Sequence, residues 1–120
     1  MAVRALRGAI TIDDDSSEEV VARTAELLNE MMALNDVSKE HLISIVFSAT
    51  SDITSEFPAA GARRLGISDI PMLCTKELDI VGAIPRVIRV LMHLETDKGY
   101  DTLRHVYLGD AKALRTDLRQ

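Results

Sequence analysis

The sequence is poor in several residue types on which common binding and catalytic sites depend. Its 120 residues include one cysteine, no tryptophan and only 3% aromatic residues. The lone Cys74 excludes a disulfide within the chain and suits a reducing compartment. So few aromatic rings argue against a stacking platform for nucleic-acid bases, and a net charge of −5 without a basic run argues against a phosphate-binding face.

Long apolar runs and clustered metal ligands are also missing. No stretch approaches the roughly 18 uncharged apolar residues that a membrane helix needs, and residues 1–7 lack the apolar core of a signal peptide. The three histidines, His41, His93 and His105, are scattered, so no metal-ligand cluster is visible. We therefore expect a cytoplasmic protein with no membrane segment, no nucleic-acid partner, no metal and no cofactor.

The sequence does contain a regular hydrophobic pattern over one expected domain, residues 1–120. Hydrophobic residues make up 47% of the chain, which is enough for a core. Alternating and helical periodicities predict the order β-α-β-α-β-β-β: strand 3–12, a helix of about four turns from the capping box Ser16/Glu19 to Asn35, strand 41–50, helix 58–65, and strands 71–74, 86–94 and 103–108, with a helical turn at 109–114. The expected fold is a small α+β or α/β domain with helices packed on a mixed sheet. So few helices leave sheet surface that oligomerisation would bury.

The unusual feature is arginine inside predicted strands. Arg7 and Arg89 each interrupt an otherwise apolar strand face, where an unpaired charge is costly. One interpretation is a structural ion pair with an aspartate or glutamate. The other is a ligand site, because the planar guanidinium matches a carboxylate with two hydrogen bonds and stays charged at physiological pH. Several such arginines in an acidic protein would make a local site for a dianion.

Other candidate residues carry weaker signals on their own. Tyr107 fits a half-buried position at the edge of the core, and Glu77 fits a solvated loop carboxylate. Cys74 has no base partner in the sequence, which favours packing or hydrogen bonding over nucleophilic catalysis. Phe57 fits a residue that packs at the start of a helix, and Arg63 fits the surface of that helix.

Five stretches, in chain order, resemble the AroH-class, or Bacillus-type, chorismate mutases. They are Arg4-Ala-Leu-Arg7-Gly8-Ala9-Ile-Thr11, Ser48-Ala-Thr50-Ser-Asp52-Ile with Phe57-Pro58-Ala59-Ala-Gly-Ala-Arg63, Ile88-Arg89-Val90-Leu-Met, Arg104-His105-Val106-Tyr107-Leu108 and Leu114-Arg115-Thr116-Asp117-Leu118. Because they run in order over essentially the whole chain, together they are far more specific than any one of them. Departures from the family pattern are Ala60 for a lysine, Leu73 for a threonine and Thr116 for a proline.

The resemblance implies both an assembly and an activity. The assembly is a pseudo-barrel homotrimer with active sites at the subunit interfaces and a flexible C-terminal tail from about residue 115. The activity is that of an isomerase, converting chorismate to prephenate by a Claisen rearrangement in tyrosine and phenylalanine biosynthesis. Such a rearrangement needs no nucleophile, metal or proton transfer. It needs oriented carboxylates and a cation at the ether oxygen, where negative charge grows.

The resemblance also implies the site residues. Arg7 and Tyr107 would hold the enolpyruvyl carboxylate of chorismate, and the catalytic Arg89 would donate to the ether oxygen. Glu77, the second catalytic residue, and Cys74 would meet the ring hydroxyl. The remaining contacts would come from the pocket wall, the neighbouring subunit and the tail: Leu73, then Phe57 and Arg63, then Arg115.

Two alternatives to a mutase stay open. A trimeric small-molecule-binding or metabolite-damage-control protein of the YjgF/RidA kind shares this general architecture. A structural oligomer with strand arginines in ion pairs would bind no specific ligand. The joint presence of Arg7, Glu77, Arg89 and Tyr107 in the motifs above favours the mutase.

Overall fold

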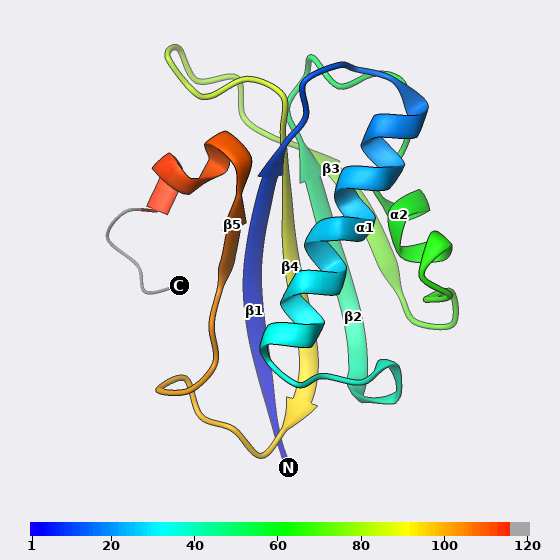
Figure 1. Ribbon diagram of the computed structural model, residues 1–120, viewed down its shortest axis with the longest axis vertical. Coiled ribbons are helices and arrows are strands. Elements are labelled where there is room, and N and C mark those ends of the chain that lie inside the picture. The colour runs from blue at the N-terminus through cyan, green and yellow to red at the C-terminus, as the bar shows by residue number, and fades with distance from the viewer. Residues whose placement is uncertain (116–120) are drawn as a thin grey trace.

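Helices and strands follow one another in the predicted order along residues 1–115, the part that the structure, a computed structural model, describes (Figure 1). They are β1 (Ala2–Thr11), α1 (Ser17–Leu34), the 3₁₀ turn η1 (Lys39–His41), β2 (Leu42–Ala49), α2 (Ala59–Arg64), β3 (Met72–Lys76), β4 (Val87–Thr96), β5 (Val106–Leu108) and the 3₁₀ helix η2 (Gly109–Arg115). The side chain of Arg115 and residues 116–120, on which the predicted tail and its substrate contact fall, lie outside the described part.

Helix α1 begins and ends where the sequence predicts. The Ser16 hydroxyl accepts a hydrogen bond from the Glu19 backbone N–H at 3.1 Å, which confirms Ser16 as the N-cap. The Glu19 carboxylate accepts from the backbone N–H groups of Asp13 and Asp14, both at 2.6 Å, rather than from that of Ser16. The 18 residues before the C-cap Asn35 make about five turns, one more than predicted.

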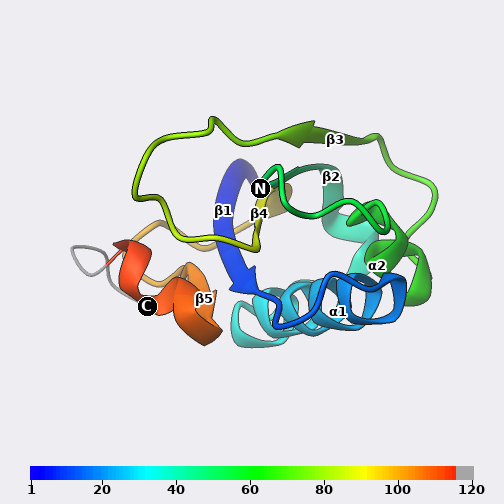
Figure 2. The same cartoon turned by 90° about the horizontal axis from the view of Figure 1, so that it is seen from above.

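The five strands form one mixed sheet in the order β3-β2-β4-β1-β5. β4 is antiparallel to its neighbours β1 and β2, whereas the edge strands β3 and β5 are parallel to β2 and β1. Helices α1 and α2 lie on the same side of β1, β2 and β4 (Figure 2). Their apolar side chains and alternate strand residues form the main core, which includes Leu6, Leu27, Phe47, Ala62 and Met92. This arrangement confirms the predicted fold class.

The opposite face of the sheet, which we call the open face, is covered only in part by the described residues. It carries the strand residues that alternate with those of the core, among them Arg7, Ser48, Leu73 and Arg89. A second, smaller apolar cluster covers one end of it, where η2 packs against β1: Ala9, Val87, Tyr107 and Ala111. The predicted strand faces are therefore confirmed, and both strand arginines lie on the open face.

Strand β5 begins later than predicted because side chains take the hydrogen bonds that a longer strand would use. The predicted strand 103–108 is regular only over Val106–Leu108. The Arg104 N–H donates to Asn35 Oδ1 at 2.7 Å, and the Arg104 carbonyl accepts from Asn35 Nδ2 at 2.9 Å. The Arg7 N–H in β1 donates to His105 Nδ1 at 3.0 Å instead of to a strand carbonyl. The predicted helical turn at 109–114 is present as η2.

Candidate active site

A row of side chains crosses the open face and brings predicted site residues together. Backbone pairing places Ser48 of β2 opposite Arg89 of β4. Arg89 is in turn opposite Ala9 of β1, whose small side chain separates it from Tyr107 of β5. Arg7 lies two residues before Ala9 and therefore on the same face. Three adjacent strands thus deliver Arg7, Arg89 and Tyr107 to one place.

These side chains line a pocket of about 230 Å³, which we call the arginine pocket. Its lining residues are Arg7, Gly8, Val46, Ser48, Arg89, Val90, Leu91 and Tyr107. Apolar walls with a few convergent polar groups are typical of sites for small molecules.

Two guanidinium groups belong to this pocket, and one carboxylate lies beside them. Glu77 Oε2 is 3.5 Å from Arg89 Nε, and 40% of the Arg89 side chain remains exposed. Arg89 Nε is shielded from solvent and has no hydrogen-bond partner among the described residues. Within residues 1–115, Arg7 forms no salt bridge. Among the described residues, ion pairing therefore accounts for Arg89 in part and for Arg7 not at all, which leaves positive charge that suits an anionic ligand.

Glu77 directly follows β3 and lies beside Arg89 at the arginine pocket. Its backbone N–H donates to the Ala49 carbonyl at 2.9 Å, which ties this residue to β2. Its carboxylate accepts a hydrogen bond from the Ser48 hydroxyl through Oε2, the oxygen nearest Arg89. Oε1 makes no hydrogen bond to a described residue, so its capacity as an acceptor is unused there. Glu77 is thus not the solvated loop carboxylate of the simpler interpretation.

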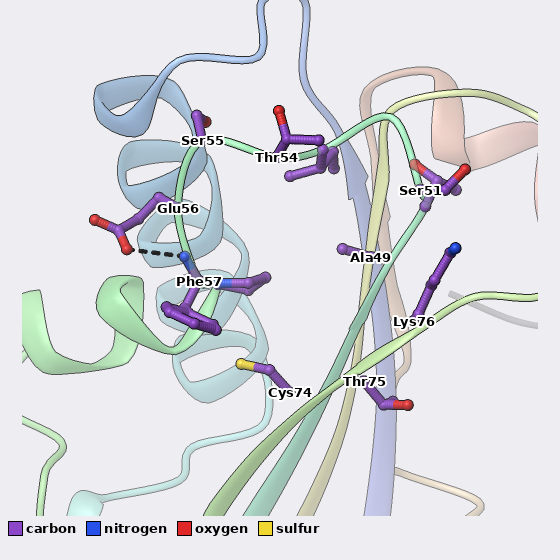
Figure 3. Close-up of a pocket in the computed structure, with 12 residues that line it drawn as sticks. Ala49, Ser51, Thr54, Ser55, Glu56, Phe57, Cys74, Thr75 and Lys76 are labelled. Carbon is purple, nitrogen blue, oxygen red and sulfur yellow. Dashed lines mark hydrogen bonds between the residues drawn. The ribbon is translucent and has the colours of Figure 1, made fainter.

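Leu73 and Cys74 are neighbours in β3 and point to opposite faces. Leu73 is 62% exposed on the open face, whereas Cys74 packs against the main core. Figure 3 shows the Cys74 thiol pointing toward Phe57. The Pro71 carbonyl and the Glu77 N–H both form hydrogen bonds to β2. The backbone groups of successive residues in a strand point alternately to its two sides, and Cys74 is three residues from both Pro71 and Glu77. The Cys74 N–H therefore points to the free edge of β3, away from β2. Its thiol lies away from the arginine pocket.

A second cavity, of about 530 Å³, lies between the 50–58 loop and β3 (Figure 3). Phe57 and Cys74 are among its lining residues, and we call it the loop cavity. The loop is anchored by Asp15, whose carboxylate accepts hydrogen bonds from the hydroxyl and backbone N–H groups of Thr54 and Ser55. These bonds, led by that from the Ser55 hydroxyl, lower the pKa of Asp15 to about 2.

The structure does not bring Phe57 and Arg63 to the arginine pocket of their own chain. Neither residue lines that pocket. Phe57 is 66% exposed beside the loop cavity, and Arg63 is exposed on α2. Because α2 packs against α1 on the covered side of the sheet, the sheet separates Arg63 from Arg7 and Arg89.

Ser48 is absent from the predicted site residues although it lines the arginine pocket and donates to Glu77. The available signal is weak: Ser48 is one of two serines, with Ser44, that lie on the same face of β2 as Val46. Its partner Arg89 is 41 residues away in sequence, so the pairing emerges only from the sheet order.

The described residues show neither a metal cluster nor a membrane helix. Within residues 1–115, no three His, Cys, Asp or Glu side chains come together in a way that could hold a metal ion. No described helix has both the length and the apolar character needed to cross a membrane.

An open sheet face that presents two arginines, a tyrosine and an acceptor carboxylate defines a binding protein or enzyme for a small carboxylate-bearing molecule. Comparison with known proteins narrows this class to one family. The sequence model of chorismate mutase type I matches residues 3–118, and the chain belongs to this family.

Individual chorismate mutases are similar to this chain over almost its whole length. The chain is 45% identical over 117 residues to chorismate mutase AroH of Thermus thermophilus, covering 97% of this chain and 96% of that protein. It is 38% identical over 119 residues to chorismate mutase AroH of Bacillus subtilis, covering 98% and 94%. A solved chorismate mutase from Clostridium thermocellum is similar with a TM-score of 0.90 and 41% identity, over 92% of this chain and 98% of that one. These matches confirm the predicted family and fold, and none of them supports the RidA-like alternative.

Proposed function

We propose that the arginine pocket is where this chorismate mutase, an isomerase, converts chorismate to prephenate. The observation that carries the proposal is the placement of Arg7, Arg89 and Tyr107 around one pocket, with Glu77 as the carboxylate beside them. Chorismate carries two carboxylates, so the excess of positive charge complements the substrate.

The residues around the pocket suit a rearrangement in which no proton is transferred. Arg7 and Tyr107 hold the enolpyruvyl carboxylate and so favour the compact chair-like conformation that reacts. Arg89, already fixed in β4, faces the ether oxygen and stabilises the negative charge that grows there as the carbon–oxygen bond breaks. Glu77 Oε1 and the backbone N–H of Cys74 meet the ring hydroxyl, the first as acceptor and the second as donor. Residue 73 lines the wall.

The complete site is shared between subunits of a homotrimer. Neither Phe57 nor Arg63 lines the arginine pocket of its own chain, and both are exposed, so they would close the pocket of a neighbour. The exposed apolar residues of the open face, such as Leu73 and Leu91, are the kind of surface that subunit contact buries. Head-to-tail contacts of this type close into rings of equivalent interfaces. Arg115 would add its charge from the tail.

The proposal also covers the domain, the cofactor requirement, the cellular compartment and the pathway. Residues 1–120 act as one domain, without a cofactor, in the cytoplasm and in aromatic amino acid biosynthesis. The lone thiol of Cys74 is compatible with a reducing compartment.

Kinetics of Arg89→Ala test the proposed chemistry. Loss of a donor at the position of developing charge typically lowers kcat by about 10²–10³, with a smaller change in KM. Arg89→Lys should also be poor, because a point charge on a flexible stem does not reproduce the planar fork. Arg64→Ala, an exposed arginine on α2 paired with Glu18, is the matched control and should be normal. Near-normal kcat in Arg89→Ala would refute the role.

Mixed trimers test the shared site. Arg89→Ala and Arg63→Glu are unfolded together in equal amounts and refolded. If each site takes these two residues from different chains, about one quarter of the sites regain both. Pairing Arg89→Ala with Arg64→Glu is the control, since Arg64→Glu should be active alone and no gain should appear. Activity no higher than the mean of the two mutants would exclude the shared site, given a clearly impaired Arg63→Glu.

A further inference from the structure

Ser48 occupies a central position in the arginine pocket without an assigned role. It lies on β2 between Arg89 of β4 and Thr75 of β3, directly opposite each in the strand registers. Its side chain is half-buried on the open face and lines the pocket. From this position on β2, the hydroxyl can reach side chains that extend over the open face from β3 or β4.

The group that it reaches is the Glu77 carboxylate. Ser48 Oγ donates to Glu77 Oε2, and no other hydrogen-bond donor in residues 1–115 reaches this carboxylate. The same oxygen is 3.5 Å from Arg89 Nε, too distant for a normal N–H···O bond. Neither terminal nitrogen of Arg89 makes a hydrogen bond to a described residue. Glu77 is thus held beside Arg89 without closing on it.

Without the Ser48 hydroxyl, no hydrogen bond from a residue in 1–115 would hold the Glu77 carboxylate away from Arg89. A carboxylate and a guanidinium prefer a pair of parallel hydrogen bonds, and the backbone of Glu77, tied to Ala49, keeps its carboxylate within reach. Because Glu77 Oε2 lies beside Arg89 Nε, such a pair would use Nε and one terminal nitrogen of Arg89, and a substrate oxygen would have to displace Glu77 from them.

We propose that Ser48 is a positioning residue whose hydroxyl holds Glu77 offset from Arg89. This offset leaves the guanidinium of Arg89 free for the substrate oxygen and leaves Glu77 Oε1 free for the ring hydroxyl. The inference rests on the roles given to Arg89 and Glu77 under the proposed function.

Kinetics of three serine variants of the full-length enzyme test this role. Hydrogen bonds to charged groups are worth enough that Ser48→Ala should lower kcat/KM by about tenfold or more. Ser48→Thr keeps the hydroxyl and suits a strand, so it should retain most of the activity. Ser44→Ala is the matched control, because Ser44 is on the same strand and face but contacts His93 outside the pocket. Normal activity of Ser48→Ala would overturn the proposal.

A double-mutant cycle with Glu77→Ala separates positioning from a general structural effect. If Ser48 acts through Glu77, Ser48→Ala should cause no further loss in the Glu77→Ala background. Equal losses in both backgrounds would overturn the proposal. A fully active Glu77→Ala would instead refute the role of Glu77 in the proposed function.

A crystal structure of Ser48→Ala gives a readout that does not depend on activity. We expect Glu77 to form two hydrogen bonds to Arg89. A Glu77 carboxylate that stays in its present place would overturn the inference, whatever the kinetics show.

Discussion

Asn35 is the polar side chain on which we expect the folded chain to depend most. It is 2% exposed at the C-terminal end of α1. Its Nδ2 donates to the carbonyl oxygens of Met31 at 2.8 Å and Arg104 at 2.9 Å, and its Oδ1 accepts from the Arg104 N–H at 2.7 Å. One side chain thus satisfies backbone hydrogen-bonding groups of both α1 and the segment that leads into β5.

Asn35→Ala removes all three hydrogen bonds and leaves their backbone partners without replacements. At about 1 kcal/mol net for each bond, the free energy of unfolding should fall by about 3 kcal/mol. That is a large part of the roughly 5–15 kcal/mol that stabilises a typical domain. For a chain of this size, at ~4 °C per kcal/mol, the Tm should fall by about 12 °C.

Urea and thermal unfolding at one fixed protein concentration measure the effect, because association makes apparent stability concentration-dependent. Asn29→Ala, at an exposed position of α1, is the matched control and should change the midpoint little. Asn35→Asp keeps the acceptor for Arg104, but it buries a negative charge against two carbonyl oxygens to which it cannot donate, so it should be no more stable than Asn35→Ala. A loss below about 1 kcal/mol in Asn35→Ala would contradict the three-bond argument.

Three further outcomes are expected. Gly61→Ala should lower the urea midpoint by an amount equivalent to about 1–3 kcal/mol, because a Cβ there would lie 2.6 Å from Thr24 Cβ and force α2 away from α1. An unchanged midpoint would show that α1 and α2 can move apart without a loss of stability. Asp15→Asn should be less stable than the wild type at pH 7. Since the folded pKa of Asp15, about 2, is below its ordinary 3.8, the ionised carboxylate stabilises the fold above about pH 4, and the difference between the two proteins should vanish as the pH falls to about 2; a difference that persists there would contradict the assignment. The kcat should be nearly flat from about pH 6 to 9, because arginine side chains in general do not titrate in that range and the reaction transfers no proton; a steep bell-shaped profile would indicate acid–base chemistry instead.

Local periodicity was sufficient to predict the order of the helices and strands and the buried and open faces of the long strands. Alternation places Leu6 and Ile10 on one side of β1 and Arg7 on the other, whatever lies next to that strand. The Ser16 cap is equally local, since its partner is three residues away. The family resemblance added the roles proposed for Arg7, Arg89 and Tyr107, which no local pattern contains.

Only the tertiary structure decided which of these residues meet. Arg7 and Arg89 share a pocket because β4 lies between β1 and β2, an order set by core packing and not by spacing along the chain. The contact between Ser48 and Glu77 likewise depends on the register of β3. The late start of β5 depends on Asn35, 69 residues from Arg104. Hydrogen bonds between distant segments form only after the chain has closed large loops, so their partners are selected by the packed fold and leave no periodic signal in the sequence.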